Sequence, residues 1–206
     1  MIIDMGPEPP SRAVTAGYRI ASVLLAIAVG FGVLWVVSIT LDIVQGGDTV
    51  QVPVQLSPDD VGPLPEGIHV VGWPDMRVDV ADPTRKQTLL QGALAIGPGL
   101  LVIAALWLLR GFLGSVLAGD PFGARNVQRL RSLGLLLAAG TPLVALVDTA
   151  LRNALFDELP PYPSLDLGSA GFSLPLGEVL AGLGAFILAE VFAYGGRLRE
   201  DVEATI

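Results

Sequence analysis

Three acidic residues lie in or beside long apolar runs, where an ionised side chain is costly and therefore suggests a function. Asp148 precedes Arg152 by four residues, a spacing that lets the two neutralise each other on one helical face. Glu178 and Glu190 lie near opposite ends of the last apolar run, and such a pair could mark a path for protons or cations. No charged residue lies midway between them, which favours structural pairing, with Arg152 within reach of Glu178.

A polar segment, GDPFGARNVQRLRSLG, separates two of the apolar runs and holds a cluster of arginines. Arg125 and Arg129 share a helical face at a spacing of four residues, whereas Arg131 points elsewhere. These side chains fit two interpretations. They contact lipid headgroups as ordinary markers of the cytoplasmic side, or they dock an acidic cytoplasmic partner.

Glu190 is predicted to pair with Arg110 or Arg125, or to extend its carboxylate towards water. The arginines of the polar segment are expected to face the acidic C-terminal tail, so that segment and tail form one surface. The predicted cytoplasmic interaction surface consists of Asp120, Arg125, Arg129, Arg131, Glu190, Arg197, Arg199 and Asp201.

The chain lacks the residues that several kinds of catalytic and metal sites need. The chain has no cysteine, which excludes disulfides, thiolate catalysis and cysteine-bound metals. Its single histidine, His69, leaves few metal sites, and neither a Ser–His–Asp set nor a phosphate-binding loop is present. The net charge of −8 argues against nucleic acid as a direct partner. We therefore expect a protein that is not an enzyme and holds no cofactor or metal.

The elements that must position these residues are four apolar runs, at 17–41, 88–117, 133–151 and 172–195. A membrane-spanning helix needs about 20 mostly apolar residues, which these runs supply, the third with a few flanking residues. The first is too long for the apolar part of a signal peptide, so it is a retained helix after a disordered cytoplasmic tail, residues 1–16. Residues 17–206 then form a single four-span membrane domain.

Helix ends and kinks follow from glycine and proline. Gly119 suits the position that ends the second helix, Asp120 is predicted to cap the next helix, and Pro121 to occupy its first position. The GPG at 97–99 and the GTP at 140–142 predict kinks inside the second and third helices.

Basic residues set the orientation. Eight of the twelve flank one side of the predicted membrane, and four lie on the other side over longer connections. Both termini and the polar segment are therefore predicted to lie in the cytoplasm.

The connection at 46–87 is then predicted to lie outside the cell, and its residue pattern indicates strands rather than helices. TVQVPVQL alternates apolar and polar residues as a half-buried strand does, and IHVVG and MRVDV indicate two more short strands. The predicted fold class is an all-α membrane protein, a four-helix transmembrane bundle with a small β-rich extracytoplasmic insertion between the first and second helices.

Two stretches carry a family resemblance. GDPFGARNVQRLRSLG is similar to a motif of G-x-P-F, a few residues, Asn, then L-R-x-[IL]-G, and ILAEVFAYGGRLREDVEATI is similar to that family's ending. With four spans, the chain resembles the uncharacterised bacterial membrane family called domain of unknown function 2975. The matching positions are Gly119, Pro121, Phe122, Asn126, Leu130, Arg131, Gly134, Glu190, Phe192, Gly195, Leu198 and Asp201.

The resemblance implies a multi-pass protein of the cytoplasmic membrane. Many relatives are encoded beside a small helix-turn-helix regulator, which implies a sensor or regulatory partner acting with such a cytoplasmic transcriptional regulator. The alternative is a small oligomeric transporter or channel for an ion or solute that uses Glu178 and Glu190. The expected partners are the lipid bilayer, the regulator and a second copy of the chain.

Overall fold

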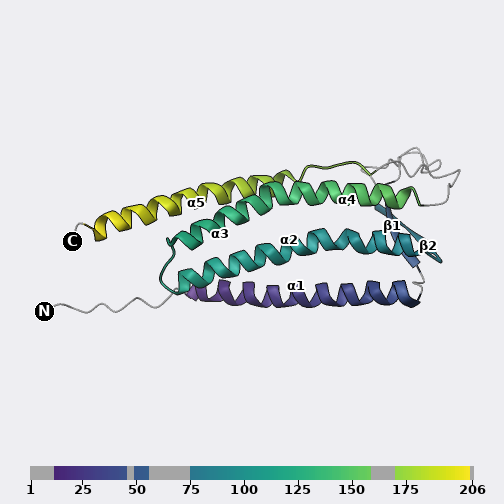
Figure 1. Cartoon of the computed structure of the whole chain (residues 1–206), viewed down its shortest axis with the longest axis horizontal. Coiled ribbons are helices and arrows are strands. Elements are labelled where there is room, and N and C mark those ends of the chain that lie inside the picture. The colour runs from purple at the N-terminus through teal and green to yellow at the C-terminus, as the bar shows by residue number, and fades with distance from the viewer. Residues whose placement is uncertain (1–11, 46–48, 56–74, 159–169, 205–206) are drawn as a thin grey trace, which may run out of the picture. The chain divides into compact units, whose positions relative to one another are not determined.

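The structure is a computed structural model, and it describes residues 12–45, 49–55, 75–158 and 170–204 (Figure 1). The described part is dominated by helices. Four helical stretches are long and apolar enough to cross a membrane, which fits a multi-pass membrane protein. They are Arg12–Gln45, Arg85–Leu117, Ala124–Phe156 and Leu176–Val202.

The elements follow one another along the chain as helix, two strands, and then a series of helices (Figure 1). They are α1 (Arg12–Gln45), β1 (Thr49–Gln55), β2 (Asp75–Ala81), α2 (Arg85–Leu117), α3 (Ala124–Leu135), the π-helical turn η2 (Leu136–Gly140), α4 (Thr141–Phe156) and α5 (Leu176–Glu203).

Two predicted boundaries differ from the structure. The tail predicted to be disordered over 1–16 is helical from Arg12, because the last residues before the apolar run, RAVTA, contain no helix breaker and extend α1. Residues 1–11 lie outside the described part. The helix predicted to begin at Pro121 begins at Ala124, and its first part, α3, is amphipathic and buries Val127 and Leu130.

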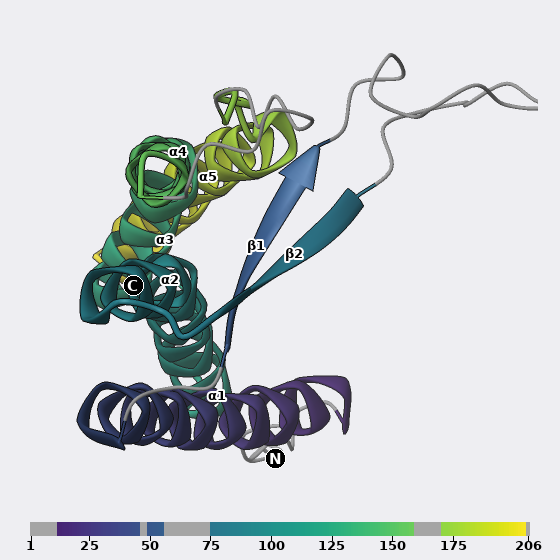
Figure 2. The ribbon, with the colours of Figure 1, turned by 90° about the vertical axis from the view of Figure 1, so that its right-hand side faces the viewer.

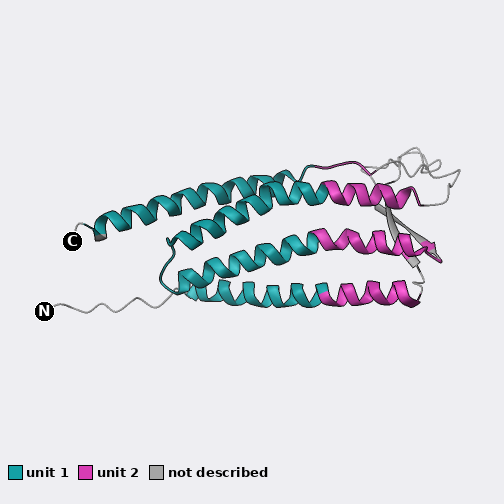
Figure 3. Cartoon of the chain, in the orientation of Figure 1, with its two compact units in different colours: residues 1–32, 98–145, 174–206 teal, residues 33–97, 146–173 magenta. Residues whose placement is uncertain are grey.

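The chain divides into two compact units, each built from parts of several helices (Figure 3). Unit 1 comprises residues 1–32, 98–145 and 174–206, and unit 2 comprises 33–97 and 146–173. The single domain over 17–206 stays a prediction.

In unit 1, α3 packs along α5, with Val127, Leu130 and Ala189 buried at the contact. The two helices approach closely where glycines face each other. A Cβ added to Gly182 would lie 2.5 Å from the backbone nitrogen of Ala138 and 2.7 Å from the carbonyl oxygen of Gly134. Because no side chain larger than hydrogen fits there, the pair fixes the spacing of the helices.

The predicted kink at 140–142 coincides with a local change of helix type. Pro142 has no N–H to donate to the preceding turn, and η2 ends directly before Thr141. Thr141 Oγ1 donates a hydrogen bond of 2.6 Å to the carbonyl oxygen of Leu137. By contrast, α2 continues as a helix through Pro98.

In unit 2, β1 and β2 pair antiparallel, with Val50 opposite Val80 (Figure 2). Val50 is 1% exposed and packs against Leu155, which is also 1% exposed. The partly buried residues around this pair are Val80, Leu90, Leu94 and Phe156. The third predicted strand, at IHVVG, lies outside the described residues. The β-rich, extracytoplasmic character of the whole insertion stays a prediction.

A capping box begins α2. The backbone N–H of Thr84 donates to Gln87 Oε1 at 2.8 Å, and the N–H of Gln87 donates to Thr84 Oγ1 at 3.3 Å. Gln87 also donates from Nε2 to the carbonyl oxygen of Glu158 at 2.9 Å, and Lys86 pairs with the Glu158 carboxylate. These bonds join the start of α2 to the turn after α4.

Candidate functional site

The end of α2 is a Schellman turn. Gly119 has φ +82°, the left-handed conformation in which glycine carries no steric penalty. Its N–H donates to the carbonyl oxygen of Val116 and the N–H of Asp120 donates to that of Ser115, both at 3.1 Å. The predicted role of Gly119 as the residue that ends the helix is confirmed.

The prediction that Asp120 caps the following helix is wrong. The N-cap of α3 is Gly123, which has an extended backbone and no side-chain cap. The Asp120 side chain lies over Gly123, where it leaves no space for a Cβ. Asn126 instead fixes the connection, because its Nδ2 donates to the carbonyl oxygens of Asp120 at 3.2 Å and Pro121 at 3.1 Å. Because α3 begins only at Ala124, Phe122 lies in the connection before it and can pack against α5.

Phe122 packs on the C-terminal half of α5. Its ring centroid lies 5.3 Å from that of Phe192, which in turn makes an edge contact with Phe112 of α2 at 5.6 Å. A Cβ added to Gly195 would lie 3.0 Å from the Phe122 ring, so Gly195 makes room for it. The aromatic cluster therefore joins the end of α2, the connection after it and α5. We call residues 118–131 together with 190–204 the α3–α5 base.

Glu190 pairs with Arg131 rather than with Arg110 or Arg125. Arg131 donates to Glu190 Oε1 from Nη2 at 2.7 Å and from Nε at 3.2 Å. The side chains are 50% and 65% exposed, respectively, so water competes with the pair. The sequence prediction chose the wrong arginine because Arg131, which points away from Arg125, is the one directed at α5.

Arg129 has no carboxylate partner among the described residues, contrary to its expected position facing the acidic tail. Its Nη1 donates to the carbonyl oxygen of Gly111 at 2.6 Å, to Ser115 Oγ at 2.5 Å and to Asn126 Oδ1 at 3.1 Å. The guanidinium group thus holds α3 against the last turns of α2. A Cβ at Gly111 would lie 2.9 Å from Arg129 Nε, so this approach depends on glycine.

Arg110 holds α1 to α2 inside unit 1. Its Nη2 donates to the hydroxyl oxygen of Tyr18 at 2.9 Å and its Nε to Ser22 Oγ at 3.0 Å. The guanidinium carbon also lies 5.2 Å from the centroid of the Tyr18 ring, a cation–π distance. Neutral partners therefore satisfy this arginine inside an apolar helix.

The remaining predicted surface residues are exposed. Arg125 stands at the start of α3 and makes no ion pair within the described part of the chain. Arg197, Arg199 and Asp201 lie on the last turns of α5. The predicted surface residues therefore lie in different local settings, and a shared interaction surface stays a prediction.

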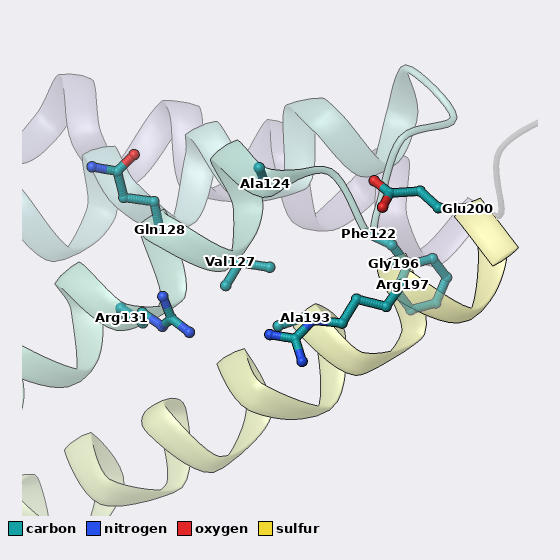
Figure 4. A pocket seen from close by; sticks show the side chains of 9 residues that line it. All are labelled: Phe122, Ala124, Val127, Gln128, Arg131, Ala193, Gly196, Arg197 and Glu200. Atoms are coloured by element: carbon teal, nitrogen blue, oxygen red, sulfur yellow. The ribbon is translucent and has the colours of Figure 1, made fainter.

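A groove of about 490 Å³ opens between α3 and α5 at this base. Figure 4 shows Arg131 and Arg197 extending into the space between the two helices, and Glu200 at the end near Phe122. The groove is lined by Phe122, Ala124, Val127, Gln128, Arg131, Ala193, Gly196, Arg197 and Glu200.

Comparison with protein families gives a match that covers the whole α3–α5 base and the last three apolar helical stretches. Residues 67–206 match the family described as protein of unknown function DUF2975. The chain belongs to the DUF2975 family. The resemblance carried by its two motifs is therefore confirmed. No curated protein and no solved structure matches the chain.

The DUF2975 motif positions meet in space although they come from two distant stretches. Phe122 contacts Phe192 and Gly195, and Arg131 pairs with Glu190. Leu130 is buried in the same contact. The two motifs are therefore the two halves of one packed structure, and their residues need no shared chemistry to explain them.

The ionisable residues predicted inside the spans are placed separately. Arg152 Nε donates to Asp148 Oδ2 at 2.7 Å, the expected pair of residues one turn apart in unit 2. Glu178 is exposed in the first turn of α5, in unit 1. Within the described ranges, no three His, Asp or Glu side chains gather as a metal site would require.

Sequence reasoning missed two sets of residues. The Arg110 contacts with Tyr18 and Ser22 lacked any signal, because their spacing in sequence carries no information on which helices are neighbours. The capping box of Thr84 and Gln87 did have one, since TRKQ before an apolar run is the pattern typical of a helix start.

Proposed function

We propose that this DUF2975 protein is a non-enzymatic, multi-pass membrane protein that acts as a sensor or regulatory partner of a cytoplasmic helix-turn-helix regulator. The proposal is supported above all by the α3–α5 base. There, the Phe122 cluster and the Arg131–Glu190 pair fold the connection after α2 onto the end of α5. This packing presents the connection and the end of α5 to a partner as one surface.

The orientation is part of the proposal. Eight of the twelve basic residues flank the side that carries the base and both termini, so we place this side in the cytoplasm of a bacterial cell. The base would then face the compartment in which a transcriptional regulator works. Its exposed Arg125 offers a positive charge for an acidic patch on that partner.

A route for a signal into the base is also available within unit 1. Arg110 joins α2 to Tyr18 and Ser22 of α1, and Arg129 joins the last turns of α2 to α3. A shift of α1 or α2 would therefore strain hydrogen bonds that end at the base. Such bonds have discrete formed and broken states, as a switching element requires.

Transcription of the protein's own operon tests the proposal. Deletion of the gene should change transcript levels in at least one growth condition, and the wild-type gene should restore them. Arg125→Glu, at an exposed position, should fail to restore regulation while the protein still accumulates in the membrane. Arg19→Glu, an equal charge change on α1, is the matched control. Unchanged transcription in every condition would refute the regulatory role.

Purified protein in liposomes tests the rival function, a small oligomeric transporter or channel. That function relies on Glu178 and Glu190 as carboxylates available to a cation, and Glu190 already accepts two hydrogen bonds from Arg131. We therefore expect no ion flux above that of empty liposomes. A flux that Glu190→Gln alters would favour the transporter instead.

A further inference from the structure

The groove at the α3–α5 base brings together two guanidinium groups from different helices. Arg131 comes from α3 and Arg197 from α5, and both extend into the space between these helices (Figure 4). Glu200, the acid that lines the groove, lies at its other end beside Phe122. The two guanidinium groups thus lie in the half of the groove away from Glu200, and the one from Arg131 also pairs with Glu190.

Both arginines retain free donors. Arg131 uses Nε and Nη2 for Glu190, which leaves Nη1 available. Arg197 is exposed and makes no hydrogen bond or ion pair with any residue that the structure describes. Arg197 thus offers a whole guanidinium fork and Arg131 its remaining donors to one groove, which suits a phosphate group with several acceptor oxygens.

The groove lies at the depth of the membrane–water interface if α5 spans the bilayer. A helix of 28 residues is about 42 Å long, which exceeds the hydrocarbon core of about 30 Å by two turns. The exposed apolar stripe of α5 nevertheless continues to its end, through Tyr194 (64% exposed), Leu198 (48%) and Val202 (60%). The last turns of α5 therefore suit the interface, where phospholipid phosphates lie.

We propose that this groove binds the phosphate of an anionic phospholipid, with Arg131 and Arg197 as its ligands. Val127 and Ala193 supply apolar surface for the glycerol part of the lipid. A volume of about 490 Å³ accommodates a headgroup with its glycerol, as ligand sites of this size do, but not a helix of a protein partner. The inference does not depend on the regulatory role, since lipid binding at the base would occur with or without a protein partner.

Native mass spectrometry of the purified full-length protein tests the site with phosphatidylglycerol and phosphatidylcholine as probes. The wild type should retain one phosphatidylglycerol in preference to phosphatidylcholine. Arg197→Gln should weaken this binding about fivefold, the effect of losing one basic contact at an anionic surface. Arg125→Gln removes an equal charge from α3 outside the groove and should leave binding unchanged. Arg197→Lys should show an intermediate loss, because lysine keeps the charge without the fork.

Glu190→Gln provides a test with the opposite sign. The substitution releases Nε and Nη2 of Arg131 and should therefore strengthen phosphatidylglycerol binding. Glu178→Gln, the same change at the other end of α5, should have no effect. Melting temperatures without lipid identify any variant that is not folded. If Arg197→Gln is not folded, the binding measured for Glu190→Gln and Arg197→Lys tests the site instead.

Three results would overturn the proposal. Equal weakening by Arg197→Gln and Arg125→Gln would show that the surface charge attracts lipid without a defined site. Stabilisation by inorganic phosphate equal to that by phosphatidylglycerol would assign the groove to a free anion. Displacement of phosphatidylglycerol by an equimolar polyglutamate peptide would assign it to an acidic protein partner.

Discussion

Arg131 and Glu190 form a two-point contact in which one carboxylate oxygen accepts hydrogen bonds from both Nη2 and Nε of the guanidinium group. The pair links α3 to α5 at the edge of the groove, beside the aromatic contact of Phe122 with Phe192. This ion pair joins the two family motifs. Phe122 and Leu130 of the first motif make apolar contacts with the second motif, at Phe192 and Ala189.

The coupling of Arg131 to Glu190 can be measured with a double-mutant cycle. Arg131→Gln and Glu190→Gln should be non-additive in the free energy of unfolding in detergent. The coupling should reach only about 0–1 kcal/mol, because both side chains are about half exposed or more. The cycle of Arg125→Gln with Glu190→Gln is the control and should be additive. Coupling in the control cycle and not in the first would contradict the observed pairing.

Arg129 should contribute more to stability than any other arginine of α3. Arg129→Lys replaces the guanidinium by an ammonium group on a shorter side chain, which cannot take the position from which Nη1 contacts Gly111, Ser115 and Asn126, and hydrogen bonds from a charged donor contribute about 1.5–3 kcal/mol each. We expect a loss of about 2 kcal/mol in the free energy of unfolding, measured by denaturation in mixed micelles. Arg125→Lys is the matched control and should change it by less than about 0.5 kcal/mol. Equal effects of the two substitutions would show that Arg129 only marks topology.

Gly182 should not tolerate a methyl group. In Gly182→Ala the new Cβ would meet backbone atoms of Ala138 and Gly134, which cannot rotate away. A lower melting temperature is expected, corresponding to about 1–3 kcal/mol of overpacking. Gly184→Ala lies on the same helix with nothing within 4 Å of the added Cβ, so it should be neutral or slightly stabilising. A melting temperature for Gly182→Ala at or above that of Gly184→Ala would mean that α3 and α5 do not pack through these glycines.

Single cysteines introduced into the cysteine-free chain should report the proposed orientation. A thiol at position 57 should react with a membrane-impermeant maleimide in intact cells, whereas one at the exposed position 204 should react only after the cells are lysed. The physical basis is the excess of basic residues on the side that holds position 204. Labelling of position 204 from outside would reverse the topology and remove the base from the cytoplasm.

The helices could be predicted from the sequence because membrane spans need only apolar length, which is a local property. The end of α2 could also be predicted from the local sequence, since Gly119 supplies the left-handed conformation that the turn needs. The N-cap could not. Asp120 has a suitable side chain, but its N–H completes the Schellman turn and α3 starts three residues later.

The pairing of the charged residues at the α3–α5 base could not be predicted from the sequence. Charge and spacing placed Arg129 and Arg131 on different faces of α3, but they carry no information on which neighbour lies opposite each face. Arg129 donates to the carbonyl oxygen of Gly111 near the end of α2, whereas Arg131 forms an ion pair with Glu190. The Phe122–Phe192 contact was also hidden, because two phenylalanines far apart in sequence give no periodic signal.

During synthesis, Phe122 leaves the ribosome well before Phe192 and Gly195, its contacts on α5. Because domains fold as the chain emerges, the connection after α2 must wait for α5 before it is covered. A chain cut short before Phe192 would keep the first three apolar helical stretches and leave the Phe122 ring without its α5 contacts. A reporter fused at such a cut would therefore report membrane insertion correctly while the α3–α5 base remained unassembled.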